Sequence, residues 1–136
     1  MQKKRILIGT LGVDQHEVGS RVVSRILRDA GMEVIYIGRF NTPKSIIKTT
    51  IEESVNVIGL SCYSWEYLSY VPELIDLLKK EGIDIPVVVG GGIFTKSDEL
   101  KLKEIGVQAV FGPGTSSDRI VQGIEQVIQK VSNETI

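Results

Sequence analysis

A loop near the amino terminus carries the only histidine of the chain, in the run Gly9-Thr-Leu-Gly-Val-Asp14-Gln-His16-Glu-Val-Gly19. One nitrogen of an imidazole ring can bind a metal while the other donates a hydrogen bond to a carboxylate, which fixes the tautomer and raises the basicity of the ligating nitrogen. Asp14 stands two residues before His16, and side chains at that spacing point the same way in an extended loop. The pair can therefore form a metal ligand and its orienting partner. The alternative is a solvated His16 beside a turn-forming Asp14.

This loop is predicted to join a strand to a helix. A strand is predicted at residues 5–8, where three branched apolar side chains follow Arg5, and apolar residues recur at helical spacing over residues 17–30. Open parallel α/β sheets bind their ligands where strands end and helices begin. His16 is therefore expected at the ligand-binding edge of a sheet.

Strands and helices alternate along the rest of the chain. Further strands are predicted at residues 33–37, 55–61, 85–89 and 107–111, and further helices at residues 43–54, 68–80, 96–104 and 116–130. Asn41 or Thr42 caps the second helix ahead of Pro43, and Gly82 and Gly106 end the next two. The pattern predicts a flavodoxin-like, doubly wound parallel sheet of five strands in the order 2-1-3-4-5, with helices on both faces. Residues 1–136 are expected to form a single domain, with a core over about 4–130 and a polar tail at 131–136.

Composition excludes several classes of protein. The chain has 136 residues, 42% hydrophobic and 24% charged, with 16 Lys and Arg against 17 Asp and Glu. A net charge of -1 disfavours a nucleic-acid partner. The single Cys62 permits no internal disulfide, and no apolar run is long enough to span a membrane. The apolar run after Arg5 stops at Gly9, too early for a signal peptide, so we expect a cytoplasmic protein.

Four loops are expected to meet at one edge of this sheet, because the carboxyl ends of strands one, three, four and five lie there. They contain Asp14-Gln-His16-Glu-Val-Gly19, Ser61-Cys-Tyr63, Gly90-Gly91-Gly92 and Gly112-Pro-Gly114-Thr115. Glycine lets a bulky ligand approach the backbone, and Ser61 adds a hydroxyl group. Each glycine-rich loop alone is compatible with an ordinary turn. Together, the four loops indicate a binding surface for a large ligand.

The sequence motifs of other nucleotide-binding and signalling domains are not found at the same positions. Gly9-Thr-Leu-Gly12 is followed by Val13 and Asp14, which breaks the Gly-x-Gly-x-x-Gly dinucleotide fingerprint, and no Gly-Lys-Ser/Thr occurs. A phosphoacceptor receiver domain needs acidic residues after the first strand and an Asp after the third. This chain has Gly9-Thr10 and Ser61-Cys62 there, so aspartyl phosphorylation is not expected.

The ordered motifs resemble the cobalamin-binding domain shared by adenosylcobalamin-dependent mutases and methionine synthase. That pattern is Asp-x-His-x-x-Gly, then Ser-x-Leu, then Gly-Gly, and the resemblance spans Lys4 to Ile128. Asn41-Thr-Pro43 and Val110-Phe-Gly-Pro-Gly-Thr115 resemble the acyl-CoA mutase branch, which includes methylmalonyl-CoA mutase and the small subunits of isobutyryl-CoA-type mutases.

The resemblance implies that the chain binds adenosylcobalamin (a form of vitamin B12) in a base-off, His-on mode. His16 would be the lower axial ligand to cobalt, with Asp14 as its hydrogen-bond partner. The chain would be the small subunit of an isomerase, inactive alone, with the TIM-barrel catalytic subunit as a separate chain. The other cofactor-binding residues predicted are Gln15, Gly19, Ser61, Tyr63, Gly90, Gly91, Gly92, Gly114 and Thr115.

One stretch departs from the family pattern, and two other functions remain open. Tyr63 replaces the usual Leu, and Trp65, Tyr67 and Tyr70 follow. These aromatic residues either stack on the corrin or its tail, dock a partner, or only cover the start of a helix. A corrinoid methyl carrier for a methyltransferase would use methylcobalamin and the same motifs, but such carriers place a helical cap before this domain. A non-catalytic cobalamin sensor or carrier is the other alternative.

Overall fold

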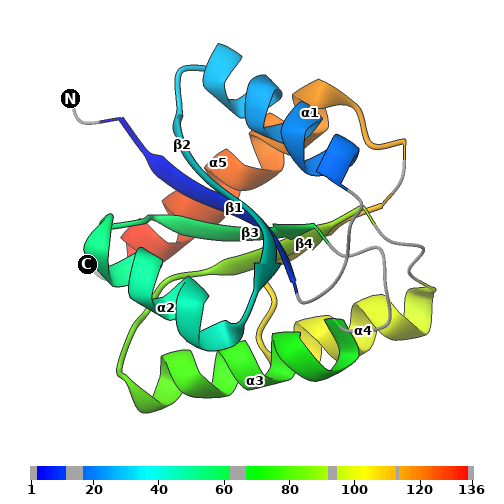
Figure 1. Cartoon of the computed structure of the whole chain (residues 1–136). Coiled ribbons are helices and arrows are strands. Elements are labelled where there is room, and N and C mark those ends of the chain that lie inside the picture. The colour runs from blue at the N-terminus through cyan, green and yellow to red at the C-terminus, as the bar shows by residue number, and fades with distance from the viewer. Residues whose placement is uncertain (1–2, 12–16, 62–66, 92–94, 113, 135–136) are drawn as a thin grey trace.

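The computed structural model describes residues 3–11, 17–61, 67–91, 95–112 and 114–134. Within them, strands and helices alternate as predicted (Figure 1). The strands are β1 (Arg5–Leu11), β2 (Glu33–Asn41), β3 (Val57–Ser61), β4 (Val87–Gly90) and β5 (Ala109–Phe111). The helices are α1 (Glu17–Asp29), α2 (Pro43–Glu52), α3 (Tyr67–Lys80), α4 (Lys96–Ile105) and α5 (Ser117–Glu134).

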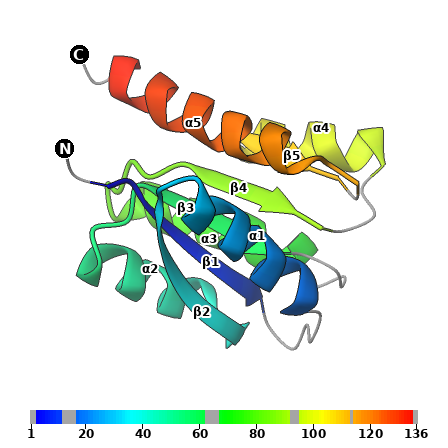
Figure 2. The ribbon, with the colours of Figure 1, turned by 90° about the horizontal axis from the view of Figure 1, so that it is seen from above.

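The described strands form one parallel sheet in the order β2-β1-β3-β4-β5, which confirms the predicted flavodoxin-like topology. The sheet is the middle of three layers, with α1 and α5 on one face and α2, α3 and α4 on the other (Figures 1 and 2). Because all pairs are parallel, the carboxyl ends of the strands lie at one edge. We call it the carboxyl edge.

Burial on both faces explains why the strands are apolar runs without strict polar alternation. All five residues of β3 are buried, and successive side chains serve opposite faces. Val57 belongs to the core cluster that contains Leu27 of α1, whereas Ile58 belongs to the cluster that contains Leu74 of α3. None of the helices in the described part of the chain has the length and apolar character needed to cross a membrane.

The second strand is longer than its sequence pattern predicted, since β2 continues past Ile37 to Asn41. Gly38 has a φ of 69°, and the register between β1 and β2 shifts beyond Ile8, so the ladder is irregular there. The buried Asn41 amide repairs it, because Nδ2 donates to the carbonyl oxygens of Thr10 (3.1 Å) and Gly38 (2.9 Å). A strand that is predicted to end before Gly38 therefore lacks this extension.

Other boundaries also differ from the sequence predictions. Helix α5 continues to Glu134 instead of ending near Lys130, because residues 131–134 contain no glycine or proline to stop it. Strand β3 begins at Val57 instead of residue 55, and β4 and β5 are each shorter at their start. Of the two candidate caps for α2, the structure uses Thr42, whose hydroxyl accepts a hydrogen bond from the Ser45 backbone (3.2 Å).

Candidate functional site

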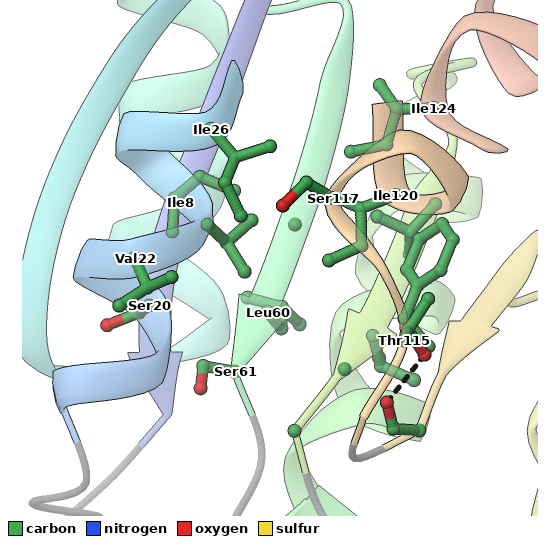
Figure 3. Close-up of a pocket in the computed structure, with 18 of the residues that line it drawn as sticks. Ile8, Ser20, Val22, Ile26, Leu60, Ser61, Thr115, Ser117, Ile120 and Ile124 are labelled. Carbon is green, nitrogen blue, oxygen red and sulfur yellow. Dashed lines mark hydrogen bonds between the residues drawn. The ribbon is translucent and has the colours of Figure 1, made fainter. Parts of the chain in front are cut away.

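A pocket of about 370 Å³ lies between α1 and α5 on one face of the sheet and reaches the carboxyl edge (Figure 3). Helix α1 supplies one wall with Ser20, Val22, Val23 and Ile26, and α5 supplies the opposite wall with Ser117, Ile120 and Ile124. The sheet and the loops that follow its strands supply the rest: Ile8, Gly59, Leu60, Ser61, Val88, Val89, Gly90, Gly91, Phe111, Gly112, Gly114 and Thr115.

The lining is apolar and uncharged, since its described residues include no Asp, Glu, Lys, Arg or His. Ile8, Ile120 and Ile124 are buried, but Val22 is 52% exposed although its side chain borders the pocket. An apolar concave surface of this size is the usual form of a small-molecule site.

Buried hydroxyl side chains lie at the carboxyl ends of β1 and β3, and of these two Ser61 lines the pocket. Thr10 and Ser61 are paired in the parallel register of β1 and β3, so their side chains project from the same face. Both are buried, and the Oγ1 atom of Thr10 has no hydrogen-bond partner within the described structure. A buried hydroxyl without a partner is destabilising by about 1–3 kcal/mol. These hydroxyls occupy the positions where a receiver domain would need acidic residues.

Glycines at the carboxyl edge bring the backbone close to the pocket. Gly91 has a φ of 91° and its N–H donates to the carbonyl of Phe111 at 3.1 Å. Gly114 has a φ of 80°, and the Thr115 hydroxyl donates to the Gly112 carbonyl at 2.6 Å. Two tight turns, one after β4 and one before α5, therefore form the rim with main chain instead of bulky side chains.

The structure brings together five of the predicted site residues around the pocket: Ser61, Gly90, Gly91, Gly114 and Thr115. Gly19 lies in the first turn of α1. Asp14, Gln15, His16, Tyr63 and Gly92 lie outside the described residues, as does Trp65. Tyr70 is partly buried against the core on the opposite face of the sheet, so it does not face the pocket.

The two helical walls were not predicted as site residues. The helical spacing over residues 17–30 and 116–130 predicts a buried stripe on each helix, but it does not show that Val22, Val23 and Ile26, or Ile120 and Ile124, line a pocket. The available signal was the width of the stripe on α1, because Val22 and Val23 are adjacent and extend it beyond the face that contacts the sheet.

Electrostatics contributes little to the described part of the site. No group of three or more His, Cys, Asp or Glu that could hold a metal occurs among the described residues. Asp98, at the start of α4, is remote from the pocket. Hydrogen bonds from the backbone and side chain of Thr95 lower the pKa of its carboxyl group. The described walls therefore suit a neutral ligand group held by apolar contact.

The family of the chain follows from comparison with known proteins. Residues 4–121 match the family model of the B12 binding domain. The chain belongs to this family.

Two relatives match over most of their own length. The small subunit of pivalyl-CoA mutase from Xanthobacter autotrophicus is 39% identical over 97% of this chain and 88% of that subunit. The small subunit of 2-hydroxyisobutanoyl-CoA mutase from Aquincola tertiaricarbonis is 36% identical over 91% of both chains. Methylmalonyl-CoA mutase from Escherichia coli is 34% identical over 96% of this chain, which corresponds to 18% of that enzyme.

Solved structures share the fold. A cobalamin-binding protein from Desulfitobacterium hafniense superposes with a TM-score of 0.78 at 24% identity, covering 93% of this chain and 60% of that one. A receiver domain from Vibrio parahaemolyticus gives the same TM-score at 11% identity, covering 98% and 96%. The fold alone therefore does not separate cofactor binding from phosphate signalling, and the residues at the carboxyl edge must do so.

Proposed function

We propose that this chain is the cofactor-binding small subunit of an adenosylcobalamin-dependent acyl-CoA mutase, with the TIM-barrel catalytic subunit on a separate chain. The observation that carries the proposal is the near full-length match to small subunits of two acyl-CoA mutases within the B12-binding family. The apolar pocket at the carboxyl edge supports it, because the uncharged base of a cobalamin tail fits such a lining. In this proposal, residues 1–136 form one domain and the protein is located in the cytoplasm, as expected from the sequence.

In this proposal, specific roles fall to His16, Asp14, Ser61 and the glycines of the rim. His16 would hold the cobalt of the cofactor, and Asp14 would orient the ring by accepting a hydrogen bond from its other nitrogen. Ser61 would lie beside the nucleotide tail in the pocket. Glycine backbone at the rim allows the tail to pass closely. The rest of the proposed set is Gln15, Gly19, Tyr63, Gly90, Gly91, Gly92, Gly114 and Thr115.

The chain itself binds and positions the cofactor and does not carry out the rearrangement. Adenosylcobalamin, when bound, supplies the radical chemistry of a carbon-skeleton rearrangement. The apolar walls would exclude water from the tail, and a hydrogen bond to Asp14 would raise the basicity of the His16 nitrogen that holds cobalt. The acyl-CoA substrate then belongs to the large subunit.

The test is the visible spectrum of the purified chain after cobalamin is added and the excess is removed by desalting. The wild type should retain a corrinoid spectrum with histidine ligation. His16→Ala should lose that ligation, and Asp14→Asn should have a smaller effect because the ligand itself remains. Asp98→Asn, which changes a carboxylate remote from the pocket, is the control.

Equal affinity and unchanged spectra in His16→Ala would contradict the axial role of this residue. The assignment to a mutase is tested separately, by adding a candidate large subunit and assaying acyl-CoA isomerisation. Activity that requires both chains supports the proposal. Methyl transfer from the bound corrinoid, without isomerisation, would replace it with a methyl carrier.

A further inference from the structure

Helix α1 carries arginines along its outer surface. Arg21, Arg25 and Arg28 are all exposed, and at helical spacing their side chains leave the helix within about 60° of one another. The residues of α1 that line the pocket, Val22 and Ile26 among them, leave from the other side of the helix. These three arginines, which we call the arginine stripe, are therefore separate from the pocket.

The stripe is unfavourable for the helix that carries it. Arg25 stands four residues after Arg21 and three before Arg28, and like charges at these two spacings repel each other on a helix surface. Arg21 has a further interaction within the chain. Among the described residues, however, Arg25 and Arg28 form no ion pair, not even with the nearby Asp29.

Elsewhere the chain pairs its charges. On α2, Nζ of Lys48 lies 3.9 Å from Oε1 of Glu52, four residues later. Where α1 leads into β2, the Glu33 carboxylate is already engaged, because its Oε2 lies 3.0 Å from Nε of Arg5. The stripe therefore concentrates positive charge on one surface of a chain whose net charge is -1. Local arrangements that oppose folding are expected where a surface has a function.

The stripe begins at the edge of the sheet where the cofactor is proposed to bind. Ser20 and Ser61 lie toward the carboxyl edge, whereas Ile26 lies farther from it (Figure 3). Arg21 directly follows Ser20, so the stripe runs from this edge along the outside of α1. A protein that covers the carboxyl edge is therefore well placed to reach the arginines.

We propose that the arginine stripe of α1 is a docking surface for an acidic region of the catalytic subunit. This inference rests on the proposed function, because the subunit that uses the cofactor must face the carboxyl edge. Guanidinium groups form forked hydrogen bonds with carboxylates, and charge attraction speeds the encounter of two proteins. Carboxylates of the partner then supply the counter-charges that α1 lacks, and offset the repulsion between its arginines.

The test measures the affinity of a candidate large subunit for the full cobalamin-loaded chain by surface plasmon resonance. Arg25→Gln combined with Arg28→Gln should weaken the complex about threefold to tenfold at low salt, because two charge pairs are lost. Lys101→Gln combined with Lys103→Gln removes the same charge from exposed positions of α4, on the opposite face, and should leave the affinity unchanged. At about 1 M salt the two double variants should bind equally, because exposed charges are screened.

A second readout separates docking from a structural role. Because the α1 double variant loses charges that repel each other, it should keep its unfolding temperature and its corrinoid spectrum while binding the large subunit less tightly. A lower unfolding temperature with unchanged subunit affinity would overturn the inference, as would equal losses of affinity in the α1 and α4 variants. Both results leave the proposed function intact.

Two further outcomes concern the identity of the partner. A wild-type chain that retains cobalamin but binds no large subunit would overturn the inference together with the proposed mutase role. Binding of a short DNA duplex that is lost in the α1 double variant would assign the stripe to a nucleic acid and overturn the inference alone.

Discussion

The two faces of the sheet differ in how completely their helices cover it. On the face of α2, α3 and α4, the core is continuous, and Leu74 and Val71 of α3 are fully buried between the helices and the strands. On the other face, α1 and α5 are separated by a pocket of about 370 Å³. One sheet therefore has a face devoted to stability and a face that leaves room for a ligand.

The difference arises from particular residues of β3. This strand presents Val57, Gly59 and Ser61 to the pocket face, and Ile58 packs in the core of the other face. Gly59 has no side chain to fill the space, and an added Cβ would lie 2.7 Å from Cδ1 of Ile8. Glycine in the middle of β3 thus leaves room for the Ile8 side chain at the floor of the pocket, where a branched residue would collide with it.

The largest expected effect comes from truncating one buried side chain on each face. Leu74→Ala should lower the free energy of unfolding by about 2–5 kcal/mol and leave corrinoid affinity unchanged, because Leu74 lies in the filled face. Ile124→Ala should be less destabilising, since it enlarges an existing pocket, but should weaken corrinoid binding. Urea unfolding and equilibrium dialysis measure the two effects. Equal losses of affinity would show that the two faces are not functionally distinct.

A smaller effect is expected from two glycines with similar backbones. Gly31 follows α1 with a φ of 93° and Gly114 borders the pocket with a φ of 80°, and an added Cβ meets no atom within 4 Å at either. Alanine at each should lower stability by a similar amount, about 1–2 kcal/mol, because both residues lie in the left-handed region. Only Gly114→Ala should also weaken corrinoid binding. The same affinity in both variants would argue against a role for the turn before α5.

The smallest effect concerns the capping box at the start of α4. Hydrogen bonds from Thr95 lower the pKa of Asp98 in the folded chain, so its carboxylate stabilises the fold above its unfolded pKa. This contribution is lost as the pH falls through the folded pKa. Asp98→Asn should reduce the acid sensitivity of thermal unfolding slightly and leave corrinoid affinity unchanged. Identical pH profiles for wild type and variant would contradict this contribution.

Much of the fold was predictable because helix and strand signals agree locally along the chain. The buried run that ends at Ser61 and the glycines after β4 also placed part of the carboxyl edge correctly. The walls of the pocket were not predictable in the same way. Apolar spacing on α1 and α5 shows that a helix has a buried stripe, but Val22 and Ile120 look the same whether a strand or a ligand covers them.

Likeness of fold would have misled a functional assignment made without the residues. The receiver domain from Vibrio parahaemolyticus and the cobalamin-binding protein from Desulfitobacterium hafniense superpose equally well on this chain. Thr10 and Ser61, paired side by side at the carboxyl edge, carry hydroxyl groups and no acidic charge. The composition of this edge, and not the course of the backbone, separates the two classes.

The position of α5 as the last described element has a consequence for the order of synthesis. The strands beneath the pocket and the wall from α1 all precede α5 along the chain, and α5 supplies the opposite wall. A ribosome makes the amino-terminal elements first. A nascent chain that has not yet released Ile120 and Ile124 has an uncovered apolar trough along β3 and β4 where the finished protein has a pocket. A ligand of this pocket can therefore contact both walls only after α5 has been translated, and until then the trough is a surface on which nascent chains can aggregate.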